Sequence, residues 1–110
     1  MYKIKATYLP RDGMVFDLDY YFRVHVPLAG AHLDPGIVVR KIEVESNAES
    51  LLEPGNKATP CVFAVYLSEK KYVDRFRAFL QTDGVAPMRE DVPKYTNCEI
   101  EWTLCEVTDV

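Results

Sequence analysis

The repeat distance between apolar residues switches along this chain, and that switching limits its fold more than any other feature. Apolar and polar residues alternate over 2–9, which is the pattern of a strand with one buried face. Over 16–33 the large side chains recur every three or four residues, as in an amphipathic helix. The predicted order is strand 2–9, helix 16–33, strand 37–45, strand 61–67, a helix between Ser68 and Gly84, and strand 98–104.

Two consecutive strand-helix-strand units with right-handed crossovers predict an α+β fold, the ferredoxin-like βαββαβ sandwich. Such a fold has a four-stranded antiparallel sheet with both helices on one face, and its last strand pairs with its first. The segment 61–67 is apolar at both its odd and its even positions, and so on both faces, as a central strand should be. Lys3 and Lys5 are then expected near Glu99 and Glu101 on the face away from the helices.

Local signals refine the two predicted helices. Pro27 removes an amide hydrogen inside the first helix, so we expect a kink or break near 24–26. Ser68 is expected to cap the second helix, and Gly84 to end it. The stretch 85–97, between that helix and the last strand, is predicted to be irregular.

A sheet with helices on only one face leaves its other face uncovered. A second copy of the chain is the economical cover for that face. The sequence therefore predicts a two-fold homodimer with stacked sheets, a dimeric α/β barrel. Detection of the monomer mass alone, across micromolar concentrations, would contradict this prediction.

Charge and composition exclude several classes of function. With 48% hydrophobic and 27% charged residues, the chain is expected to form one globular domain over 1–110. The net charge of -4 argues against a nucleic-acid partner, because phosphate binding depends on clustered Lys and Arg. No stretch approaches the roughly 20 apolar residues needed to cross a bilayer, and no secretion signal opens the sequence. We therefore expect no membrane association and a cytoplasmic location.

The cysteines and histidines do not predict a metal site. Cys61, Cys98 and Cys105 are odd in number and form no CxxC pair, which favours reduced thiols over disulfides or a four-cysteine zinc site. His25 and His32 lie seven residues apart, a poor spacing for shared metal ligation, and His32 is expected at the surface. A Gly-rich phosphate loop is also missing. No metal or other cofactor is predicted.

Three stretches of the sequence carry a family resemblance. They are TYLPRDG at the end of the first strand, FDLDYYFRVHVPL in the first helix and EDVPKYTN before the last strand. The most distinctive pair is YYxxxHxPL at 20–28, preceded by Phe16, and DVPxYT at 91–96. Over nearly its whole length the chain resembles the EthD family of dimeric alpha-beta barrel proteins. The family is named after a protein that is encoded together with the ethyl tert-butyl ether degradation system.

The resemblance implies a small cytoplasmic dimer without a tightly bound metal or flavin, and with a cavity between sheet and helices in each subunit. Members and relatives in the superfamily include decarboxylases, cyclases, isomerases and cofactor-free monooxygenases that act on aromatic or polyketide-like molecules. Many members have no assigned activity. The family name therefore does not identify a reaction.

The candidate site centres on His25 and Tyr21, which lie four residues apart and so share one face of the helix. His25 is the candidate general base or acid, and Tyr21 is the candidate donor to an enolate or phenolate oxygen. Four further aromatic residues are expected to contact a small hydrophobic ligand. They are Tyr8, Phe76, Tyr95 and Trp102.

Alternatives stay open at this point. His25 could instead bond a backbone carbonyl freed by Pro27, and the stripe of Tyr72, Phe76 and Phe79 is also explained by core packing. The leading interpretation is a cofactor-independent enzyme acting on an aromatic or keto compound. The alternative functions are a non-catalytic ligand-binding or accessory dimer, and a structural module whose interior is filled by its own side chains.

Overall fold

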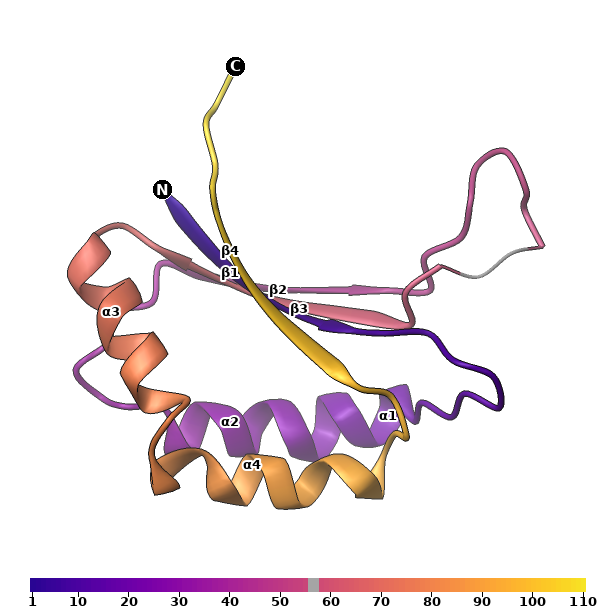
Figure 1. Cartoon of the computed structure of the whole chain (residues 1–110), viewed down its shortest axis with the longest axis horizontal. Helices are drawn as coiled ribbons and strands as arrows, with labels where there is room; N and C mark the ends of the chain where they lie inside the picture. The colour runs from indigo at the N-terminus through magenta and orange to yellow at the C-terminus, as the bar shows by residue number, and fades with distance from the viewer. Residues whose placement is uncertain (56–57) are drawn as a thin grey trace.

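The computed structural model describes residues 1–55 and 58–110. Its four strands form one antiparallel sheet in the order β2-β3-β1-β4 (Figure 1). The strands are β1 (Tyr2–Tyr8), β2 (Lys41–Ser46), β3 (Cys61–Leu67) and β4 (Ile100–Glu106). β1 and β3 are central and β4 pairs with β1, so the predicted α+β fold and strand order are confirmed.

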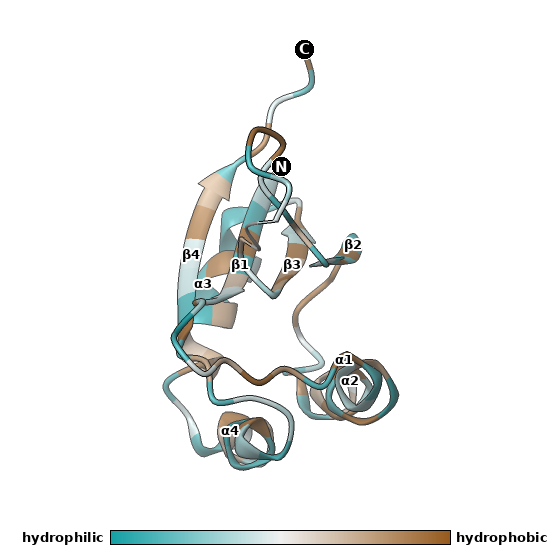
Figure 2. Ribbon diagram, turned by 90° about the vertical axis from the view of Figure 1, so that its right-hand side faces the viewer, coloured by the Kyte–Doolittle hydropathy of each residue, from teal (hydrophilic) through white to brown (hydrophobic). Residues whose placement is uncertain are grey.

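The helices pack on the face of the sheet that carries the buried residues of β1. They are α1 (Leu18–Tyr20), α2 (Val26–His32), α3 (Lys70–Phe79) and α4 (Ala86–Asp91). α1, α2 and α4 run beneath the sheet, and α3 closes one end (Figure 1). Within the described residues the opposite face of the sheet carries no helix (Figure 2). None of the described helices is both long enough and apolar enough to span a membrane.

Two apolar clusters hold the helices against the sheet. One includes Ile4, Val65 and Phe76 and lies between the sheet and α3. The other includes Tyr8 and Tyr21 and lies between the sheet and the helical segment that begins with α1. Full burial of one such side chain contributes about 1.5–3 kcal/mol, so these clusters dominate the packing of sheet on helices.

The strand register corrects the expected charge pairs on the uncovered face. Lys5 lies opposite Thr103, and Thr7 lies opposite Glu101. The ammonium group of Lys3 instead lies 5.2 Å from the centre of the Tyr66 ring on β3. Glu101 is therefore a diagonal neighbour of Lys5, whereas Lys3 and Glu99 lie at opposite ends of the β1–β4 pair, and the expectation was wrong for those two residues.

The irregularity expected before Pro27 takes the form of a π-helical turn over Tyr21–His25, which joins α1 to α2 in one continuous helix. The amide of Val26 donates to the carbonyl of Tyr21, five residues back. Proline cannot donate a backbone hydrogen bond, so an α-helical bond from Pro27 to Arg23 is impossible. The widened turn leaves Tyr21 and His25 both buried, with ring centres 5.4 Å apart.

The second half of the chain differs from its prediction in three places. Glu69, not Ser68, is the N-cap residue of α3, and it makes no side-chain capping bond. The helix ends at Phe79, before Gly84, which lies in a 3₁₀ turn. β2 starts at Lys41 and not at residue 37, because Ile37 packs into the core beside α3.

The stretch 85–97 is largely helical, and the prediction of an irregular segment was wrong. It contains α4 and a 3₁₀ turn over Val92–Lys94. Pro87 and Pro93 lie at the first or second position of these two elements. Proline fits there because the first amides of a helix need no intrahelical partner. This segment brings α4 beside α2, on the same side of the sheet (Figure 2).

Candidate active site

A cavity of about 130 Å³ lies between the buried face of the sheet and the helices. An engineered apolar cavity of roughly 150 Å³ in another protein binds benzene, so this space is the size of one aromatic ring. Trp102 lies in its wall with 42% of its surface exposed, which puts the indole at the mouth. Most other lining residues are apolar. They include Ala6, Val26, Ala29, Phe63, Val65, Phe76, Met88 and Ile100.

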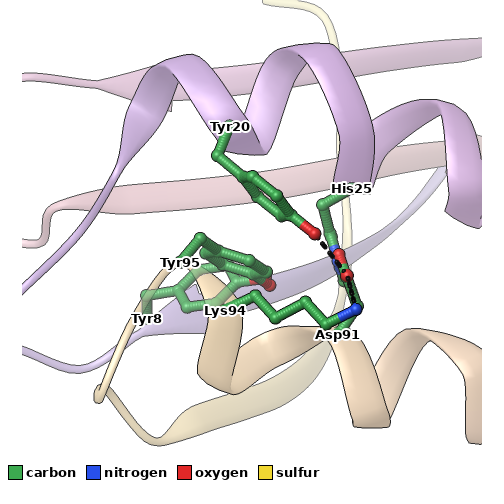
Figure 3. Close-up of polar contacts among 6 residues, drawn as sticks. All are labelled: Tyr8, Tyr20, His25, Asp91, Lys94 and Tyr95. Atoms are coloured by element: carbon green, nitrogen blue, oxygen red, sulfur yellow. Dashed lines mark hydrogen bonds and ion pairs between the residues drawn. The ribbon is translucent and has the colours of Figure 1, made fainter.

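His25 lies in the cavity wall and is held by Asp91. Its Nδ1 atom lies 3.0 Å from Oδ2 of Asp91, across 66 residues of sequence. Both side chains are buried, with residue exposures of 7% and 5%. The imidazole comes from the π-helical turn and the carboxylate from the last residue of α4, so the two helices under the sheet meet at this bond (Figure 3).

The proton positions in this pair follow from the pKa directions. Burial lowers the pKa of His25, although Asp91 partly opposes that shift, and the imidazole is therefore neutral near pH 7. An ionised carboxylate can only accept a hydrogen bond, so Nδ1 of His25 carries the proton and donates it to Asp91. The other ring nitrogen, Nε2, is left without a proton. It is the nitrogen available to act as a base.

Asp91 stays ionised because it has three polar neighbours. Burial raises its pKa, but hydrogen bonds from Tyr20 and His25 outweigh this and the net pKa is lowered. The hydroxyl of Tyr20 donates to Oδ1 over 2.6 Å, and the ammonium of Lys94 lies 3.8 Å from the same oxygen (Figure 3). A carboxylate fixed in this way orients the imidazole and stabilises its protonated form when a proton is taken up.

A second polar pair lies beside the first. The hydroxyl oxygens of Tyr8 and Tyr95 are 2.6 Å apart and buried. Burial raises the pKa of Tyr8 to about 12, so its hydroxyl is protonated near neutral pH and can donate. The ring of Tyr95 also packs on the imidazole of His25, with centres 4.6 Å apart. Tyr95 therefore supports both polar groups of the site.

Tyr21 lies in the cavity wall and is buried among aromatic rings. Its ring lies 5.7 Å from that of Tyr8 and stacks on His25 at an angle of 20°. Burial raises the pKa of Tyr21 well above its usual range, so this phenol serves only as a neutral hydrogen-bonding group. Burial likewise raises the pKa of Cys61, to about 11, which makes that thiol a poor nucleophile.

The structure brings most of the predicted site residues to one place. Tyr8, Tyr21, His25, Phe76 and Trp102 line the cavity. Tyr95 is not among the lining residues and lies behind His25, against Tyr8.

The imidazole of His25 does not bond the backbone carbonyl that the sequence analysis offered as an alternative partner. The bond from Nδ1 goes to a carboxylate and not to a backbone carbonyl freed by Pro27. Phe76 belongs both to the apolar core and to the cavity wall. His32 is exposed, as predicted.

Sequence reasoning missed Asp91 and Tyr20 as members of the site. Both lie inside the motifs YYxxxHxPL and DVPxYT that carried the family resemblance. An acid within a distinctive motif, in a chain with a candidate catalytic histidine, was the available signal. Among the described residues, no three His, Cys, Asp or Glu side chains cluster as metal ligands would.

Comparison with known proteins identifies the fold. No protein-family model and no curated protein sequence matches the chain. A crystal structure of an EthD-like protein from Ralstonia eutropha JMP134 superposes with a TM-score of 0.74 at 22% identity, over 98% of this chain and 92% of the other. A crystal structure of an ethyl tert-butyl ether degradation (EthD) family protein from Bacillus halodurans C-125 gives 0.65 at 19% identity, over 98% and 99%. Over nearly its whole length, the chain therefore has the fold of EthD-family proteins, as its motifs indicated.

Proposed function

We propose that this protein is a cofactor-independent enzyme of the EthD type that performs acid-base chemistry on a small aromatic or keto compound. The observation that carries the proposal is the buried His25–Asp91 pair in the wall of an apolar, ring-sized cavity. Apolar cavities with a few convergent polar groups and perturbed pKa values are typical of small-molecule active sites.

The proposed step is proton transfer at a carbon next to a carbonyl group. Nε2 of His25 takes the proton, and the electron pair of the broken C–H bond moves to the carbonyl oxygen to give an enolate. Asp91 stabilises the imidazolium that forms. A neutral phenol from Tyr21 or its neighbour Tyr8 donates a hydrogen bond to the enolate oxygen. Return of a proton from His25 to the same or another atom completes an exchange or isomerisation.

Hydrogen exchange into an aryl ketone tests this step directly. Acetophenone in D₂O loses its methyl proton signal as a base exchanges those protons for deuterons. Wild-type protein is expected to accelerate this loss, and His25→Ala to reduce the acceleration by about a hundredfold, the usual size of acid-base assistance. His32→Ala is the matched control because His32 is exposed on α2. Binding of the ketone without accelerated exchange would favour the alternative, a non-catalytic ligand-binding protein.

We also propose that two copies of the chain pair through their uncovered sheet faces. That face carries charges of both signs, because Lys3, Lys5 and Lys41 share it with Glu43, Glu45 and Glu101. A two-fold axis can therefore place unlike charges together. Sedimentation across micromolar concentrations should give the mass of a dimer, and Lys5→Glu should weaken it. A monomer mass throughout would rule out the pairing.

We also propose that the protein is cytoplasmic and belongs to the EthD family. Cys61 and Cys98 are buried free thiols and Cys105 is an exposed one, which suits a reducing cytoplasm. Membership of the EthD family is supported by the shared fold together with the two motifs that supply Tyr20, His25 and Asp91.

A further inference from the structure

The cavity wall carries an unbalanced charge. Among the described residues that line it, Arg89 is the only one with a permanent charge, and no Asp or Glu is among them. The other ionisable groups in the lining are neutral near pH 7, since burial lowers the pKa of His25 and raises those of Tyr8 and Tyr21. The cavity therefore presents a cation to any ligand that enters it.

Arg89 is exposed and comes from α4. One of its Nη atoms donates to the carbonyl of Leu80 at the end of α3. A guanidinium has five donor hydrogens, so this single bond leaves most of its hydrogen-bonding capacity unused. Asp91, two residues further on, does not share the same side of α4 and is bonded to Tyr20 and His25.

We infer that the natural ligand is a monocyclic aromatic carboxylate whose ring fills the cavity and whose carboxylate binds Arg89. The inference rests on the proposed function, since it concerns the same cavity, and it adds the chemical class of the ligand. A planar guanidinium can bind a carboxylate through two parallel hydrogen bonds, which gives both affinity and orientation.

The size of the cavity suits a ligand with one ring. Its volume of about 130 Å³ is close to that of a cavity that binds benzene, so a single ring fills the space inside the wall. A side arm can reach the mouth, where Trp102 and Arg89 are both exposed. Ring and arm together describe arylacetates and related aromatic acids.

The charges also fix the direction in which the ligand enters. The Asp91 carboxylate lies directly behind His25, so a second carboxylate at that end would meet a like charge in a buried setting. The ligand carboxylate is therefore directed to Arg89, and the opposite end of the ring faces His25. This orientation leaves the group to be deprotonated, a phenol or an enolisable carbon, next to the base.

Isothermal titration with 4-hydroxyphenylacetate and its neutral isostere 4-hydroxyphenylacetamide tests the inference. Wild-type protein should bind the acid at least about tenfold more tightly than the amide, the effect of one charge-assisted hydrogen bond. Arg89→Gln should bring this ratio close to one. Glutamine removes the charge while keeping a side-chain N–H donor, although that donor has a shorter reach than the Nη atom that bonds the Leu80 carbonyl.

Arg77→Gln is the matched control, because Arg77 is an exposed arginine on α3 paired with Asp74. It should keep the wild-type preference for the acid. Unchanged binding of the amide by Arg89→Gln shows that its cavity is intact.

Two results would overturn the inference. Equal affinity of wild-type protein for acid and amide would remove the carboxylate site and leave the proposed acid-base function standing. Failure of wild-type protein to bind either compound would count against both proposals.

Discussion

The imidazole of His25 donates from Nδ1 to a carboxylate oxygen of Asp91 3.0 Å away, although 66 residues separate them in sequence. The bond sets the tautomer of His25 and thereby makes Nε2 the basic nitrogen. It also joins the π-helical turn Tyr21–His25 to the end of α4. One contact therefore contributes both to the chemistry of the site and to the packing of two helices.

The first prediction concerns Asp91→Asn. Both the hydrogen bond and the charge of Asp91 raise the pKa of His25, so the variant should lower that pKa further below its usual value. Ketone exchange should fall by about a hundredfold or more, because the neutral amide no longer stabilises the imidazolium. Titration of the His25 ring by NMR measures the first effect, and deuterium incorporation measures the second.

Asp74→Asn serves as the control for this variant, because Asp74 is an exposed acid on α3. It should leave both quantities unchanged. Tyr20→Phe should have a smaller effect on exchange than Asp91→Asn, since it removes one donor and keeps the carboxylate charge. A His25 pKa that rises in Asp91→Asn would contradict the assigned hydrogen bond from Nδ1 of His25 to the ionised carboxylate of Asp91.

The second prediction concerns acid sensitivity. The folded-state pKa of His25 lies below its usual value near 6.5, so the unfolded chain binds more protons as pH falls through that value. Stability should therefore decrease as pH falls from about 7 to 5. The lowered pKa of Asp91 gives a further loss of stability below about pH 4, in the same direction.

Urea unfolding at several pH values measures this dependence. His25→Gln should show a weaker loss of stability between about pH 7 and 5 than wild type. His32→Gln, which changes an exposed histidine, should retain the wild-type dependence. If the free energy of unfolding depends on pH in the same way in wild type and His25→Gln, the buried imidazole does not contribute to the acid sensitivity.

The third prediction concerns the hydroxyl pair of Tyr8 and Tyr95, which are 2.6 Å apart and buried. Tyr8→Phe and Tyr95→Phe should each lower the free energy of unfolding by about 1–3 kcal/mol, because each leaves the other hydroxyl without this partner. The double variant should lose less than the sum of the two single losses. Strict additivity in urea unfolding would show that the two hydroxyls are not coupled.

The sequence predicted the sheet better than the site. β3 was predicted with its observed bounds, because Cys61–Leu67 is apolar on both faces and only a central strand buries both. α4 lies in the stretch predicted to be irregular, and it was missed although Pro87 and Pro93 each lie in the first turn of a helical element, where proline is favoured.

His25 was recognised as a site residue because Tyr21 lies four residues before it on one helical segment. Its partner Asp91 was not, because the pairing depends on how α4 packs beside α2, and local spacing carries no information on such a contact. The positions of the charged residues across β1 and β4 also depend on contacts between segments that are distant in sequence. Register on the polar face is set by the buried face, where Ile4 lies opposite Leu104.

The last prediction tests whether the cavity holds the ligand. Ala29 lies on α2 in the cavity wall, and Ala29→Leu adds three carbon atoms to that wall. The larger side chain should fill the ring-sized space and weaken binding of 4-hydroxyphenylacetate by at least about tenfold. Because it fills a void, the free energy of unfolding should change by less than about 1.5 kcal/mol.

Ala31→Leu places the same side chain at an exposed position of the same helix and should leave binding unchanged. Calorimetry of both variants, together with their urea unfolding curves, separates a blocked cavity from a damaged fold. Wild-type affinity in a stably folded Ala29→Leu would place the ligand outside the cavity, and His25 would then lose its assignment as the base.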